Sequence, residues 1–139
     1  MSNVEFAESL PEADRGGTPL CERFVVGSIL IDGGMRAHTK DLSPSEFGDA
    51  ALGKVFQMLM DVDGPVDLAI AVDEAEKRGL AKATGIHGMM VYLSSLMDYV
   101  PDLENIGEYA KRVKRAAVAR RVASEFEKLR LQRANRMAL

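Results

Sequence analysis

Apolar residues recur along most of this chain at the spacing of a helix face. Ser43, Pro44 and Glu46 form the pattern of an N-cap, a first helical residue and a capping box. After them an apolar residue returns every three or four positions, at Phe47, Leu52, Val55, Phe56, Leu59 and Met60. The pattern predicts a helix that begins at Pro44 and ends near Asp61.

Two further helices have clear end signals. Asp67 is placed to cap a helix through Arg78, which Gly79 would end in a left-handed conformation. Residues 85–88 then form a loop before an apolar helix that begins at Met89 and is interrupted by Pro101.

The last predicted helix is the longest. Asp102 can cap it, and it would run from Leu103 to about Arg136, a length of about 50 Å. Its apolar residues fall close to a single stripe: Ile106, Tyr109, Val113, Ala117, Val122, Phe126 and Leu129. Because this helix outruns the small domain before it, its far half must either pack on another surface or fray.

Residues 20–31 have an ambiguous pattern. The β-branched run from Val25 to Ile31 suits a buried strand, whereas Leu20, Phe24 and Ile31 lie at helical spacing. Pro19 suits a first helical turn. Periodicity leaves both structures open.

These patterns divide the chain into three parts. Residues 1–18 predict a flexible lead-in, because they are polar and contain Pro11 and the pair Gly16-Gly17. Residues 19–103 predict a globular domain, and residues 104–139 predict the long helix. The predicted fold is all-α: a compact bundle of short helices followed by one long protruding helix.

Composition narrows the class of protein. The chain has 139 residues, of which 47% are hydrophobic, enough for one folded domain with its own core. Its single cysteine cannot form an internal disulfide, and no signal peptide or membrane-spanning apolar run is apparent. We expect a cytoplasmic protein with no membrane partner.

Charge is distributed unevenly. Residues 1–103 contain 8 basic and 17 acidic residues, whereas residues 104–139 contain 10 basic and 4 acidic ones. Six cations lie together: Lys111, Arg112, Lys114, Arg115, Arg120 and Arg121. We interpret them as a solvated flank that tunes subunit or partner contacts. The alternative is direct contact with nucleic acid. That contact would be weak and non-specific, because Tyr109 is the only stacking aromatic among the cations and no helix-turn-helix precedes them.

The sequence contains no recognisable catalytic constellation. His38 and His87 are far apart, Cys21 has no CxxC partner, and no phosphate-binding glycine loop is present. Residues 61–67 superficially resemble a calcium loop but lack its later oxygen ligands. We predict no catalytic residues, no cofactor and no metal.

The order of the motifs resembles the N-terminal domain of replicative DNA helicases of the DnaB family. Glu22, Gly27 and Asp32 match its first helix, and "GPVDL" at residues 64–68 is similar to its Gly-x-Pro-Ile-Asp. Further matches are Leu42, Glu46-Phe47, Val55-Phe56, Tyr92-Leu93, Val100-Pro101, Asn105, Tyr109-Ala110 and Val113. The likeness spans Pro19 to about Val122 and implies a helix at residues 20–31. The chain departs from the family at Gly48, commonly an aromatic, and at Leu52, commonly histidine.

The resemblance implies a non-catalytic collar domain. In this family, helical hairpins pair between subunits of a hexameric ring, and the collar docks primase. The long helix would be the first arm of such a hairpin, and the chain is expected to lack the ATPase motor. The candidate interface for a homo-oligomer, primase or helicase loader is Val118, Val122, Phe126 and Leu129. The alternatives are a stand-alone regulator that binds a host helicase and a non-specific nucleic-acid-binding helical domain.

Overall fold

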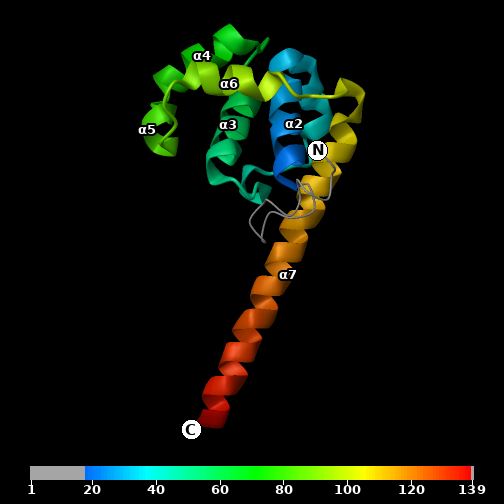
Figure 1. Ribbon diagram of the computed structural model, residues 1–139, viewed down its shortest axis with the longest axis vertical. Helices are drawn as coiled ribbons and strands as arrows, with labels where there is room; N and C mark the ends of the chain where they lie inside the picture. The colour runs from blue at the N-terminus through cyan, green and yellow to red at the C-terminus, as the bar shows by residue number, and fades with distance from the viewer. Residues whose placement is uncertain (1–17, 139) are drawn as a thin grey trace.

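The computed structural model describes residues 18–138, and all regular structure in this range is helical. Short helices form a bundle, and one long helix leaves it (Figure 1). This arrangement confirms the predicted all-α fold with a long protruding helix. The predicted flexible segment 1–18 lies outside the described residues, except for Thr18, which begins the first helix.

The first described helix, α2 (Thr18–Ile31), forms the centre of the bundle. Val25, Val26 and Ile29 are fully buried, and α2 packs against α3, α6 and α7. The helix implied by the resemblance is therefore confirmed. Apolar side chains are buried on several sides of α2, and this burial outweighs the strand propensity of its β-branched residues.

Gly27 allows a close contact between α2 and α6 (Met89–Met97). A β-carbon at Gly27 would collide with the backbone carbonyl oxygen of Leu96 and lie 2.8 Å from a methyl carbon of Val100. Because one of these neighbours is backbone, it cannot rotate away. Glycine at this position thus sets the distance between the two helices.

The predicted helix start at Pro44 is wrong. Pro44–Glu46 forms only one 3-10 turn (η3), although the Glu46 carboxylate does accept a hydrogen bond from the Ser43 N–H at 2.8 Å. The helix α3 (Ala50–Asp61) begins six residues later, capped by Asp49, whose carboxylate accepts from the Leu52 N–H at 3.2 Å. The backbone is extended at the intervening Phe47, whose buried ring packs on Phe56 with centroids 4.9 Å apart.

The end of α3 is closed by an arginine from a distant segment. Arg36, in the 3-10 helix η2 (Gly33–Thr39), donates to the carbonyl oxygens of Leu59, Val62 and Gly64 at 3.2, 2.8 and 2.6 Å. The last carbonyls of a helix have no partner within the helix. Arg36 therefore donates hydrogen bonds to three carbonyl oxygens at the end of α3 and in the following turn, which would otherwise have only water as a donor.

The next helix ends follow the predicted signals. Asp67 caps α4 (Leu68–Lys77) by accepting from the Ile70 N–H at 2.9 Å, and Gly79 has the predicted left-handed conformation, with φ 63°. A short helix that was not predicted, α5 (Leu80–Thr84), follows before α6. Asp102 caps a 3-10 turn, η4 (Leu103–Asn105), which leads into the long helix.

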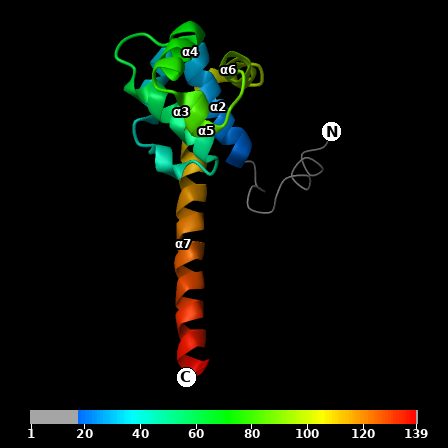
Figure 2. The same cartoon turned by 90° about the vertical axis from the view of Figure 1, so that its left-hand side faces the viewer.

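The long helix α7 (Ile106–Ala138) contains 33 residues and is thus about 50 Å long. Its first part lies against α2, and its remainder continues past the bundle in the views of both Figure 1 and Figure 2. We call the exposed part from Val118 to Ala138 the arm.

Replacing Gly27 by alanine should lower the free energy of unfolding by about 1–3 kcal/mol, because α2 and α6 must separate to admit the methyl group. Gly107→Ala is the matched control, since a β-carbon there meets no atom within 4 Å. That variant should be neutral or gain up to about 1 kcal/mol from helix propensity. Chemical denaturation of both variants measures the difference, and equal effects would contradict the close contact.

Candidate functional site

The first part of α7 is anchored by its apolar face. Ile106, Ala110, Val113 and Ala117 recur every three or four residues, and all four are buried against the bundle. Tyr109 adds an aromatic contact with Phe24 of α2, with ring centroids 5.3 Å apart. After Ala117, every residue of α7 up to Ala138 is exposed.

The four predicted interface residues all lie on this exposed part. The exposed fractions are 45% for Val118, 49% for Val122, 69% for Phe126 and 60% for Leu129. They are three or four residues apart and therefore share one face of the helix. We call these four residues the outer stripe.

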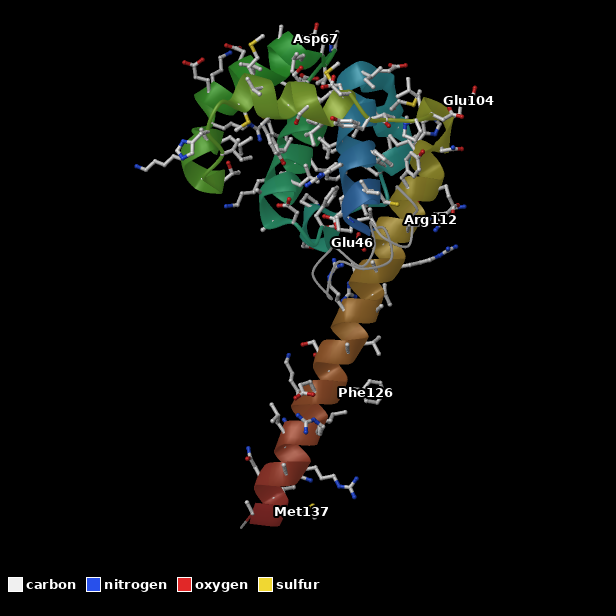
Figure 3. All side chains as sticks on the ribbon, in the orientation of Figure 1. Glu46, Asp67, Glu104, Arg112, Phe126 and Met137 are labelled. Carbon is white, nitrogen blue, oxygen red and sulfur yellow. The ribbon has the colours of Figure 1, made fainter. Side chains whose placement is uncertain are left out.

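The outer stripe does not continue the buried face, so the prediction of a single stripe along α7 is wrong. Val122 follows Val113 by nine residues, and Phe126 follows Ala117 by nine. Nine residues are two and a half helical turns, which place the second member of each pair on the opposite side. Figure 3 shows Phe126 on the side of α7 that faces away from the bundle.

The cations near the base of the arm have different roles. Lys114 Nζ donates to the Asp41 carbonyl oxygen at 2.6 Å, and Arg120 Nη2 donates to the Glu46 carbonyl oxygen at 2.9 Å. Arg112 pairs with Glu108 within α7 at 3.3 Å.

The other three predicted cations, Lys111, Arg115 and Arg121, are exposed and make no hydrogen bond or ion pair with any residue in the range 18–138. The structure thus separates the six cations that the sequence had grouped together.

A buried carboxylate supports the Arg120 contact. Glu22 of α2 is only 2% exposed and accepts a hydrogen bond from the Asp49 N–H at 3.0 Å. Burial raises the pKa of Glu22, while hydrogen bonds from the Asp49 and Gly48 N–H groups and the positive charge of Arg120 oppose the rise. A positive charge next to this carboxylate lowers the cost of keeping it ionised inside the protein.

Gly48 provides the space for this arrangement. A β-carbon at Gly48 would lie 3.2 Å from Glu22 Oε2 and 3.4 Å from Arg120 Nη1. A larger side chain at this position would compete with the Arg120 guanidinium for this volume. We call the contacts of Lys114 and Arg120 with the bundle the anchor. The pattern of the sequence does not predict the anchor, and its only local signal is an acidic residue, Glu22, inside an apolar run.

The arm itself is strongly basic. Between Val118 and Ala138 it has 6 basic and 2 acidic residues. Both acids already have partners on the same helix: Glu125 pairs with Lys128 at 3.3 Å, and Glu127 pairs with Arg130 at 2.6 Å. The outer stripe is therefore an apolar surface in a positively charged setting.

The remaining candidate groups do not converge on a reaction centre. Within residues 18–138, no three metal-ligating side chains come together, and no helix is long and apolar enough to cross a membrane. Cys21 is half-buried, and burial raises the pKa of its thiol, which disfavours the reactive thiolate. The feature that points to function is the arm with its outer stripe, a surface suited to binding another protein.

Comparison with known proteins places most of the chain in one family. Residues 18–115 match the model of the DnaB-like helicase N-terminal domain. The replicative DNA helicase DnaB of Treponema pallidum is 31% identical over 100 residues, and that of Geobacillus stearothermophilus is 32% identical over 106 residues. The alignments cover 71% and 73% of this chain.

The fold also matches a solved structure. The crystal structure of the N-terminal domain of DnaB helicase from Mycobacterium tuberculosis aligns with a TM-score of 0.70 and 27% identity, over 78% of this chain and 79% of that one. By contrast, the alignments span only 23% and 22% of the two curated helicases. The family model ends at Arg115, before the outer stripe begins.

Replacing Arg120 by glutamine should lower the free energy of unfolding by about 0.5–1 kcal/mol, because a partly exposed, charge-assisted hydrogen bond to the Glu46 carbonyl is lost. Arg121→Gln, one position further along, is the matched control and should change stability little. Thermal denaturation of both variants provides the measurement. Equal melting temperatures would show that Arg120 does not anchor the arm.

Proposed function

This chain belongs to the family of DnaB-like helicase N-terminal domains, and on that basis we propose that it serves as the non-catalytic collar of a replicative DNA helicase. In this role it acts in the cytoplasm during DNA replication. It brings helicase subunits together in a ring and docks primase or a helicase loader. In this proposal α7 is the first arm of a helical hairpin.

The outer stripe is the observation that carries this proposal. It presents four apolar side chains on an exposed helix that has left its own bundle. A helix that packs on no other part of the protein has only marginal stability in water. An arm of this kind therefore gains stability when a partner packs on it. Full burial of a single valine, leucine or phenylalanine side chain contributes about 1.5–3 kcal/mol.

The geometry of the arm also supports a binding role. From Arg121 to Ala138 the helix extends about 27 Å beyond the anchor. Because Phe126 of the outer stripe points away from the bundle, a partner can approach it without meeting the bundle. The arm is thus accessible to a second subunit or to a different protein.

Substituting Val122 or Phe126 by aspartate should abolish association through the arm, because each change places a charge in the contact. Size-exclusion chromatography with light scattering should give a mass above that of the monomer for the wild type and the monomer mass for the two variants. Met90→Asp, an equally exposed apolar position on α6, is the control and should associate normally. A strictly monomeric wild type, unchanged by the arm substitutions, would count against the proposal.

Nucleic-acid binding is a second candidate function, which three exposed cations favour. Lys111, Arg115 and Arg121 have no partner among residues 18–138, so they are available to phosphates. If all three neutralise a phosphate, a plot of log affinity against log salt for duplex DNA should have a slope of about −2.7. Fluorescence anisotropy should show that this slope vanishes when Lys111, Arg115 and Arg121 are all replaced by glutamine. The control variant Lys82→Gln should keep the slope. No binding at about 0.05 M salt would eliminate this function.

A further inference from the structure

The face of α7 that carries the outer stripe has cations at both of its ends. Lys111 and Arg115 precede the stripe, and Arg133 and Arg136 follow it. The spacing of three or four residues continues through all of them, so they share the face of the stripe. All four cations are exposed. The face is therefore apolar in its centre and positively charged at each end.

The acids of α7 do not neutralise these four cations. Each of its three acids pairs with another cation of the same helix: Glu108 with Arg112 at 3.3 Å, Glu125 with Lys128 at 3.3 Å and Glu127 with Arg130 at 2.6 Å. The cations at the two ends of the stripe make no ion pair with any residue from 18 to 138. Their charge is thus available to an acidic group from elsewhere.

Residues 1–17, which we call the acidic segment, have the composition that complements this face. They contain four acids and one base, whereas residues 19–103 contain 7 basic and 13 acidic residues. The bundle therefore repels the acidic segment, and α7 attracts it. Besides Met1, the large apolar side chains of the segment are Val4, Phe6 and Leu10, and its acids lie between and after them, at Glu5, Glu8, Glu12 and Asp14.

The acidic segment joins the bundle beside the base of the arm. It ends where α2 begins, at Thr18. The first turns of α2 lie against α7, because a β-carbon at Gly48 would lie within 3.4 Å of both Glu22 Oε2 and Arg120 Nη1. Figures 1 and 2 both show the start of α2 beside α7, near the level where α7 leaves the bundle.

The acidic segment is long enough to reach the outer stripe. Phe126 lies nine residues past Ala117, which is about 14 Å along the helix axis. Passing to the opposite side of a helix about 10 Å wide adds about 16 Å. Phe6 lies twelve residues before Thr18, and an extended chain of that length spans about 40 Å. Both Phe6 and Leu10 can therefore reach the stripe of their own chain.

We infer that the acidic segment covers the outer stripe of its own chain. Phe6 and Leu10 pack on the apolar centre of the face. Glu12 and Asp14, which are closer to α2 in sequence, lie next to the two cations at the base of the stripe. This assignment rests on the proposed function and adds a regulation of the same surface, because a partner of the arm must first displace the acidic segment.

Attachment to the same chain makes a weak contact effective. A tethered segment acts at an effective concentration on the order of millimolar, so a contact of about millimolar affinity already covers much of the stripe. The apparent affinity for a partner falls in proportion to the fraction of copies whose stripe is free. If about two thirds of the copies are covered, binding of a partner weakens about threefold.

Disulfide trapping tests which side of α7 the acidic segment contacts. In a Cys21→Ser background, Ser9→Cys is combined either with Val122→Cys, on the outer stripe, or with Ser124→Cys as the matched control. Both arm positions are exposed, and two residues apart means about 200° around the helix. At a concentration where the protein is monomeric, the disulfide within one chain should form at least about fivefold faster with position 122 than with position 124.

Two further changes should reduce this preference. Replacing Phe6 and Leu10 by serine removes the apolar contact, and about 0.5 M salt screens the charges. Equal rates for the two positions without these changes would show that the acidic segment does not bind the stripe. Disulfides that join two chains would show that it binds the arm of another copy. Either result would overturn the inference.

The effect on association is measured separately by sedimentation velocity. The variant with serine at both Phe6 and Leu10 should self-associate through its arm at least about threefold more tightly than the wild type. Serine at both Ala7 and Ala13 is the matched control and should leave association unchanged. Equal association of the two variants would overturn the regulation. If neither variant associates at all, the proposed function fails, while a preference for position 122 in the trapping experiment still supports the covered stripe.

Discussion

The packing of α2 against the first part of α7, from Ile106 to Ala117, is the contact on which the rest of the molecule depends. It buries the centre of the bundle, and it fixes the base of a helix that continues for many residues without interruption. Because an α-helix is rigid over this length, the orientation of Val113 and Ala117 in the core decides where Val122 and Phe126 point. The outward direction of the outer stripe is thus set inside the bundle, by residues that never contact a partner.

Charge is separated along this chain rather than mixed over its surface. The acidic residues belong mainly to the bundle, and the basic residues belong mainly to α7. Lys114 and Arg120 use their charge at the junction, where they donate to backbone carbonyls of the segment before α3. Farther out, among residues 18–138, the cations of the arm form ion pairs only with Glu125 and Glu127 of α7 itself, so the remaining positive charge acts on whatever approaches from outside.

Local signals in the sequence predicted the parts of the fold that depend on near neighbours. Asp67, Gly79 and Pro101 mark helix ends because capping and backbone restriction act within a few residues. The start of α3 was predicted wrongly because Phe47 is drawn into the core by Phe56, which outweighs a good capping box. The residues of the outer stripe could be predicted from their spacing. Their direction could not, because it requires knowing that the buried contact of α7 with the bundle ends at Ala117. The anchor could not be predicted, since Arg120 and Glu46 are 74 residues apart in sequence.

The continuous helix also restricts how the length of the arm can change among relatives. A single residue inserted between Ala117 and Val118 would turn the outer stripe by about 100° about the helix axis, whereas seven would restore its direction to within about 20° and lengthen the arm by about 10 Å. An insertion of eleven residues restores the direction equally well, because it completes three turns to within about 20°. Proteins that share this arrangement should therefore differ in arm length by steps such as seven or eleven residues, which leave the outer stripe on the same side.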